Sequence, residues 1–173
     1  MGVHGLWEVL SDVAQERSLA EFVAYELVNW KSNGRDVAIV GVDASELMYA
    51  AQSSIHSARV RGASRASEGK NADLRLVFKQ LVWLASTFYG QILVFVFDGP
   101  DRPQVKRGKR VGKCEHWMVE DFQRLVRALG FYVHQAPGEA EAELAHLNET
   151  GLIDFVFTSD SDAFVFGAVN VIR

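Results

Sequence analysis

The stretch that decides the fold runs from residue 137 to residue 162 and reads PGEAEAELAHLNETGLIDFVFTSDSD. Its first half predicts a helix. Pro137 suits a first helical turn, where its missing N–H would be unpaired anyway. Behind it, Ala140, Leu144 and Leu147 recur at helical spacing and supply a stripe for burial. The two glutamates of the GEAEA segment therefore fall at the start of this helix.

The second half of the same stretch predicts a buried strand. Residues 153–157 are short, aromatic and β-branched, and turn formers bound them on both sides. Asp160 and Asp162 follow directly, just past the carboxyl end of the strand. In open parallel sheets this edge is where ligands bind.

Outward from this unit, apolar runs alternate with helical patterns along the whole chain. Further strands are predicted at residues 37–42, 92–97, 131–134 and 169–172. Helices are predicted at residues 4–16, 19–30, 45–52, 74–88 and 118–129, with an exposed connection at 53–71. This alternation predicts an α/β fold with a mainly parallel central sheet flanked by helices.

Composition sets outer limits on the function. The 173 residues suffice for one domain with a real core, and no apolar run approaches the roughly 20 residues that span a bilayer, so no membrane partner is expected. Cys114 is the only cysteine, which permits no internal disulfide and fits the cytosol or nucleus.

Charge is distributed unevenly. The net charge of −4 argues weakly against a nucleic-acid partner. One segment nevertheless favours a nucleic-acid partner, because it holds six basic residues and no acid: Arg102, Lys106, Arg107, Lys109, Arg110 and Lys113. A solvated loop explains such a segment as well as a phosphate-binding surface does.

Six acids lie at predicted strand ends or at the start of the helix predicted in the first half of the 137–162 stretch: Asp43, Asp98, Glu139, Glu141, Asp160 and Asp162. Each alone is explained more simply as a helix cap, a turn residue or a complement to a helix dipole. Together they would repel one another at a single sheet edge unless a cation neutralised them. Oxygen ligands without histidine or cysteine select Mg²⁺ or Mn²⁺, and two such ions about 3.5–4 Å apart are typical of phosphodiester cleavage.

Residue spacing alone does not identify which glutamates of this helix would bind a metal. Residues two apart do not share a helix face, so spacing alone would pair Glu139 with Glu143 rather than with Glu141. Both Glu139 and Glu141 could reach a metal from a first helical turn, but the sequence spacing does not show it.

Five motifs, in order and spacing, resemble the flap endonuclease/XPG family of structure-specific 5′ nucleases. They are MGVHGLW at 1–7, Val42-Asp43, FVFDG at 95–99, GEAEA at 138–142 and Asp160-Ser161-Asp162. The similarity runs essentially from end to end. The resemblance implies a 5′ nuclease, PIN-like fold.

The resemblance also assigns roles to residues. It implies that the six acids hold two Mg²⁺ ions, for which Mn²⁺ can substitute, and it favours Glu141 as the second glutamate. Lys106 resembles the lysine that faces the scissile phosphate, with Arg110 as the arginine beyond it. Gly2 resembles the exposed N-terminus near the DNA branch point. The DNA-binding set it implies is Gly2, Lys106, Arg107, Lys109, Arg110 and Lys113.

Within the family, the start of the chain is similar to the XPG and Holliday-junction-resolvase branches. Gly138, Leu147-Asn148 and residues 166–173 look most like the resolvase branch. This implies a nuclear or shuttling enzyme of DNA repair and recombination that binds four-way junctions, dimerises on them, makes paired nicks and also cuts 5′ flaps.

The resemblance divides the chain into an N-region at 1–105 and the start of an internal region at 106–173. It places the last aspartate ligand and the helix–two-turn–helix DNA clamp beyond Arg173, so the chain is expected to be the amino-terminal portion of a longer enzyme and to need the rest. The basic stretch is shorter than the arch that threads a free 5′ end in flap enzymes.

Three other functions stay open. A flap or XPG-type repair endonuclease would share the site. A non-cutting nucleic-acid-binding module could keep the fold and one metal. A phosphatase or phospho-receiver domain would share an acidic Mg²⁺ site but would leave the basic stretch unexplained.

Overall fold

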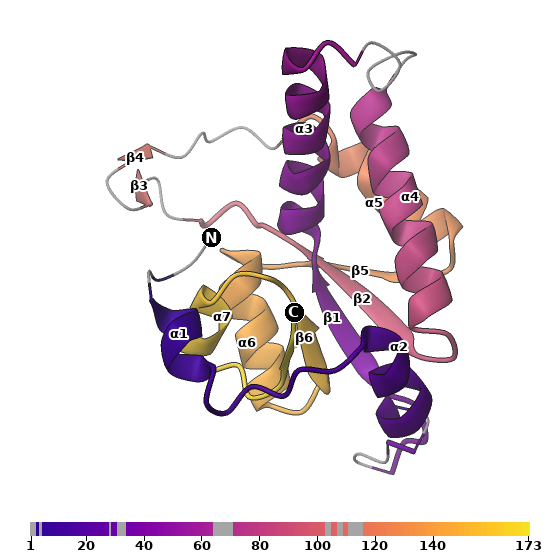
Figure 1. Ribbon diagram of the computed structural model, residues 1–173, viewed down its shortest axis with the longest axis vertical. Helices are drawn as coiled ribbons and strands as arrows, with labels where there is room; N and C mark the ends of the chain where they lie inside the picture. Colours follow the sequence, from indigo (N-terminus) through magenta and orange to yellow (C-terminus); the bar gives the residue numbers. More distant parts are fainter. Residues whose placement is uncertain are drawn as a thin grey trace.

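The computed structural model is built on one five-stranded sheet. It describes residues 3, 5–27, 29–30, 34–63, 71–102, 105–106, 109–110 and 116–173, and only the backbone of 105–106 and 109–110. The strand order is β5-β2-β1-β6-β7 and every neighbouring pair is parallel (Figure 1). The strands are β1 (Ile39–Asp43), β2 (Ile92–Phe97), β5 (Tyr132–Gln135), β6 (Phe155–Phe157) and β7 (Val171–Ile172). The predicted α/β class is therefore confirmed.

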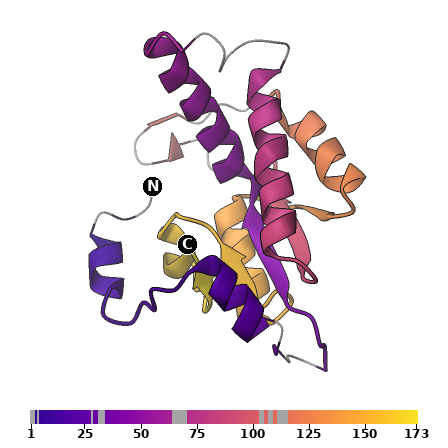
Figure 2. The same ribbon diagram turned by 45° about the vertical axis from the view of Figure 1, so that its right-hand side comes forward.

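One face of the sheet carries the larger core. Alternate strand side chains, among them Val40, Val42, Phe95 and Phe97, are fully buried there. The elements that contribute side chains to this core are α2 (Leu19–Phe22), the π-helical turn η1 (Val23–Leu27), α3 (Ala44–Val60), α4 (Ala72–Thr87) and α5 (Val119–Ala128). Helices α3 and α4 run side by side in both views, and α3 continues upward from the end of β1 (Figures 1 and 2).

The other face carries a smaller core under α6 (Ala140–Glu149) and α7 (Asp162–Val165). Gly41 lies at the centre of this face, where a Cβ atom would come within 2.5 Å of both Ile153 and Leu144 side chains. The missing side chain lets α6 pack closely on β1. The short helix α1 (Leu6–Leu10) lies beside α7, with Trp7 edge-on to Phe164 at 5.7 Å between ring centroids.

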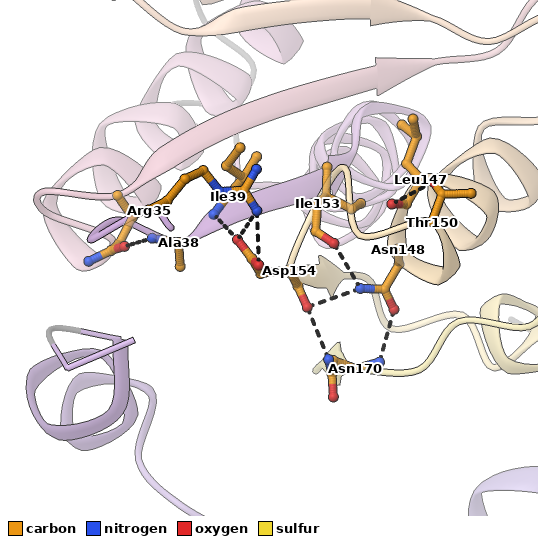
Figure 3. A network of polar contacts seen from close by, with 10 residues as sticks. Arg35, Ala38, Ile39, Leu147, Asn148, Thr150, Ile153, Asp154 and Asn170 are labelled. Carbon is orange, nitrogen blue, oxygen red and sulfur yellow. Dashed lines mark hydrogen bonds and ion pairs between the residues drawn. The ribbon is translucent and has the colours of Figure 1, made fainter. Parts of the chain in front are cut away.

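A polar network joins the strands at their amino ends (Figure 3). The Asp154 carboxylate accepts hydrogen bonds from the Arg35 guanidinium at 3.2 Å and from the backbone N–H of Ile39 at 2.8 Å. The buried amide of Asn148 donates to the carbonyls of Ile153 and Asp154 and accepts from the backbone N–H of Asn170 at 2.9 Å. These contacts tie β1, α6 and the segment before β7 together at the end of the sheet opposite to the acids.

Several predicted boundaries were wrong. The helix expected at 45–52 runs as α3 to Val60, because Ile55 and Ala58 extend its buried stripe into the expected connection. The helix expected at 4–16 covers only Leu6–Leu10, and the one expected to reach residue 30 ends at Leu27. No helix among the described residues is both long enough and apolar enough to cross a membrane.

Candidate metal centre

The predicted acids gather at the carboxyl edge of the sheet. Asp43 is the last residue of β1, and Asp98 directly follows β2. Glu141 lies in the first turn of α6, Asp160 follows β6, and Asp162 opens α7. Parallel strands β1, β2 and β6 are neighbours in the sheet, so their carboxyl ends deliver these residues to one place.

Three of these carboxylates form a compact triad. One carboxylate oxygen from each of Glu141, Asp160 and Asp162 lies within 4.8 Å of the others. Asp160 and Asp162 are buried and Glu141 is half-buried. A hydrogen bond of 3.1 Å from the Asp162 N–H to Asp160 Oδ1 sets the turn between the two aspartates.

Asp43 lies beside this triad and has the most perturbed acidity. Burial, together with the negative charges of Glu141, Glu46 and Asp98, raises the pKa of Asp43 to about 8, against the lowering effect of the hydrogen bond from the Glu46 backbone. Asp43 Oδ1 also caps α3, accepting from the N–H groups of Ser45 at 2.9 Å and Glu46 at 3.2 Å. The helix-cap explanation is therefore correct, and it coexists with a place in the acidic cluster.

Asp98 ties three segments together. Its Oδ1 accepts from the Ala140 N–H at 2.9 Å, the first N–H of α6, and its Oδ2 accepts from the Ser45 hydroxyl at 3.1 Å. The guanidinium of Arg102 lies 3.6 Å from the same Oδ2. The carboxylate that follows β2 thus holds the starts of both α3 and α6 in register with the site.

The turn after β2 presses against the loop before α6. The Gly99 N–H donates to the Gly138 carbonyl at 2.6 Å, and the Asp101 N–H donates to the Pro137 carbonyl at 3.0 Å. A Cβ atom on Gly99 would lie 1.8 Å from the Ala136 carbonyl oxygen, so only glycine fits at this contact.

The structure places Glu141 and Glu143 differently, which decides a choice that the residue spacing could not make. Glu143 points to the neighbouring strand, where its carboxylate lies 2.7 Å from His134 Nε2. Glu141 joins the triad instead. The sequence predicted a helix that begins at Pro137 and holds Glu139 in its first turn. Helix α6 instead begins at Ala140, so Glu139 is its N-cap residue and has an extended backbone.

The predicted basic ligands are described only in part. The backbone of Lys106 pairs with that of Lys109, because the short strands β3 (Val105–Lys106) and β4 (Lys109–Arg110) are antiparallel neighbours. Gly2, Arg107 and Lys113 lie outside the described residues. The roles predicted for Lys106, Arg110 and their neighbours stay predictions.

Two polar residues of the site were missed by sequence reasoning. Ser45 donates to Asp98, and Glu46 accepts from Thr158 Oγ1 at 3.0 Å and from the Ser159 N–H at 2.8 Å. A serine and a glutamate in a first helical turn are ordinary, so their sequence signal is weak. Their distance of two and three residues from Asp43 was the one available clue.

The donor set fits a hard divalent cation. Carboxylate oxygens alone supply the triad, and Mg²⁺ and Mn²⁺ prefer oxygen ligands. A cation would also relieve the repulsion that Asp43 experiences from its acidic neighbours.

Comparison with known proteins points in one direction. Residues 130–173 match the XPG I-region family model. Flap endonuclease GEN-like 1 of Arabidopsis thaliana is 36% identical over 124 residues, which are 58% of this chain and 20% of that protein. Flap endonuclease GEN homolog 1 of Mus musculus is 29% identical over 192 residues, covering 100% of this chain and 18% of that protein.

A solved structure shares the fold along nearly the whole chain. The Holliday junction-resolving enzyme GEN1, in complex with product DNA, Mg²⁺ and Mn²⁺ ions, superposes with a TM-score of 0.71 at 28% identity, over 99% of this chain and 36% of that one. This chain therefore spans well under half the length of these relatives. The matched I-region, the shared fold and the acids at the sheet edge all make this chain similar to the flap endonuclease/XPG family and to its GEN branch.

Proposed function

We propose that the protein containing this chain is a Mg²⁺-dependent, structure-specific DNA endonuclease. Its substrates are branched DNA: four-way junctions, which it resolves by paired nicks, and 5′ flaps. The observation that carries the proposal is the triad of Glu141, Asp160 and Asp162 with Asp43 and Asp98 beside it at one sheet edge. The similarity to the Holliday junction-resolving enzyme GEN1, whose structure holds product DNA, Mg²⁺ and Mn²⁺ ions, supports the substrate class.

The six acids Asp43, Asp98, Glu139, Glu141, Asp160 and Asp162 would hold two ions. Bound there, such ions activate water and stabilise the leaving oxygen of the phosphodiester. Asp98 fixes where α6 begins, and the Asp160 to Asp162 turn fixes two carboxylates against it.

The basic stretch completes the proposal. Lys106 and Arg110 would contact the scissile phosphate, with Arg107, Lys109 and Lys113 on the neighbouring DNA backbone and Gly2 at the branch point. Because phosphate contacts release counterions, binding would weaken steeply with salt.

Organisation and setting are part of the proposal. Residues 1–105 would form an N-region and residues 106–173 the start of an internal region, consistent with the I-region match at 130–173. Further residues of the intact protein would supply a DNA clamp and the last metal ligand, and two copies would act on one junction. We place the enzyme in the nucleus, or shuttling into it.

The proposal is tested with the intact protein, Mg²⁺, a labelled static four-way junction and a labelled 5′ flap. Paired, symmetric nicks in the junction are the expected result. Cutting of the flap alone would reassign the protein to the flap or repair branch. Binding of both substrates without any cutting would contradict the nuclease and favour a non-cutting binding module.

A further inference from the structure

We propose that Glu46 is a positioning residue of this metal centre, which clamps the segment carrying Asp160 to the start of α3. This inference deepens the proposed function and rests on it. Glu46 lies on α3, three residues after Asp43, whereas the segment that it contacts follows β6, more than a hundred residues later in the chain.

Both Glu46 carboxylate oxygens are used as hydrogen-bond acceptors by one short segment. Oε2 accepts from the Thr158 hydroxyl at 3.0 Å and from the Ser159 N–H at 2.8 Å. Oε1 accepts from the Ser159 hydroxyl. A half-buried carboxylate with three donors is held far more firmly than an exposed one.

The clamp continues to the triad through a chain of hydrogen bonds. Thr158 Oγ1, which donates to Glu46, accepts from the Asp160 N–H at 3.1 Å. Asp160 Oδ1 in turn accepts from the Asp162 N–H at 3.1 Å. At its other end, the Glu46 N–H donates to Asp43 Oδ1 at 3.2 Å. One residue therefore links Asp43 on β1 to Asp160 and Asp162 after β6.

A carboxylate at this position has an electrostatic cost, because its charge adds to those already facing Asp43. The hydrogen-bond geometry offsets that cost. Metal sites tolerate errors of about 0.2 Å in ligand distance, so a segment that lacks its clamp would present Asp160 less accurately. Residues that orient ligands typically contribute 10–100-fold to metal affinity.

The test compares two substitutions of one residue. Glu46→Met removes every acceptor at similar size. Glu46→Gln keeps an oxygen for Thr158 and the Ser159 N–H, and its amide group can donate to the Ser159 hydroxyl. We expect Glu46→Met to weaken Mn²⁺ binding by about 10-fold or more and Glu46→Gln to restore most of the loss. If Gln lost as much as Met, the charge of Glu46 rather than its hydrogen bonds would support Mn²⁺ binding, and the positioning role would be wrong.

The readout is Mn²⁺ titration of the intact protein by electron paramagnetic resonance, without DNA, with Glu120→Gln on the exposed side of α5 as the control. Ser159→Ala provides an independent variant. Combined with Glu46→Met, it should add little further loss, because both act on one contact. Full additivity, or unchanged Mn²⁺ affinity in Glu46→Met, would overturn the inference.

Failures of the two proposals are distinguishable. Weakened Mn²⁺ binding in Glu46→Met, with no cutting by the unaltered protein, would leave the clamp standing and remove the nuclease. If the unaltered protein cuts DNA but its Mn²⁺ affinity is the same with and without the Glu46 substitution, the nuclease proposal stands and the clamp is wrong. An unaltered protein that bound no Mn²⁺ would overturn both.

Discussion

At the scale of single residues, Asp43 shows how one side chain serves the fold and the site at once. Its Oδ1 caps α3, and its burial beside Glu141 and Asp98 raises its pKa to about 8. A cap alone would not need the neighbouring acids. The acids therefore make the metal-free protein less stable than the same fold with a neutral residue at this position.

This perturbed acidity predicts a pH dependence. The ordinary pKa of 3.8 applies to the unfolded chain and the raised value of about 8 to the folded one, so between these values the folded state binds the extra proton. The contribution of Asp43 to the free energy of unfolding is therefore fully present below about pH 4 and is lost as the pH rises to about 8.

Asp43→Asn keeps an oxygen for the cap and should remove this dependence. Urea unfolding in EDTA at pH 5 and pH 9 measures it. We expect the unaltered protein to lose at least about 1 kcal/mol more than the variant between the two pH values. Equal losses would contradict the assignment, and Asp12→Asn, exposed near the N-terminus, is the control.

The acids at strand ends were predictable from the sequence, because a buried strand ends where its apolar run ends, and the carboxyl ends of parallel strands lie at one edge of the sheet. Glu141 over Glu143 was not predictable from spacing, since the choice depends on His134 drawing Glu143 away. Glu46 was not predictable either, because its partners Thr158 and Ser159 are remote in sequence.

At the scale of elements, the site depends on how the turn after β2 seats against the loop before α6. Gly99 makes this contact possible, and Gly138 lies in the facing loop. A Cβ atom at Gly99 would strike the Ala136 carbonyl, whereas a Cβ atom at Gly138 would lie 3.8 Å from its nearest neighbour, the Asp101 carbonyl oxygen.

Gly99→Ala should therefore destabilise the fold by about 2–4 kcal/mol, because backbone would have to move. Gly138→Ala, the matched control, should cost less than about 1 kcal/mol. The midpoints of urea unfolding compare the two. A Gly99→Ala variant as stable as Gly138→Ala would show that this contact does not constrain the turn.

Element boundaries followed the sequence only where packing and local signals agreed. Strand β2 matched its prediction at 92–97 because its six apolar residues in a row are buried or half-buried between the neighbouring strands β1 and β5. Helix α3 was underestimated because Ser53 and Ser54 are typical of loops, while the deciding residues Ile55 and Ala58 are buried by the fold itself.

At the scale of the whole molecule, the two ends of the sheet have different roles, one in the candidate metal site and the other in holding the strands together. The carboxyl end gathers acids that repel one another, and the amino end holds the Asp154 and Asn148 network that fastens the strands (Figure 3). This division predicts that stability and metal binding can be changed separately.

Asp154→Ala tests the division. It would leave the half-buried Arg35 guanidinium and the Ile39 N–H without their acceptor, at a cost of about 2–4 kcal/mol in the free energy of unfolding. Asp121→Ala, which breaks an exposed pair with Arg124, should cost less than about 1 kcal/mol. Under conditions in which both variants remain folded, each should bind Mn²⁺ with the same affinity as the unaltered protein. A large loss of affinity in Asp154→Ala would show that the two ends are coupled.

The most direct test of the metal centre as a nuclease site is junction cleavage by the Asp160→Asn variant of the intact protein in Mg²⁺, beside the exposed control Asp12→Asn. The substitution keeps the shape of a buried triad member and removes its charge. We predict a loss of cleavage of about a hundredfold or more, with junction binding retained, because losing a ligand exceeds the cost of losing a residue that orients one. Undiminished cutting by Asp160→Asn would contradict the account.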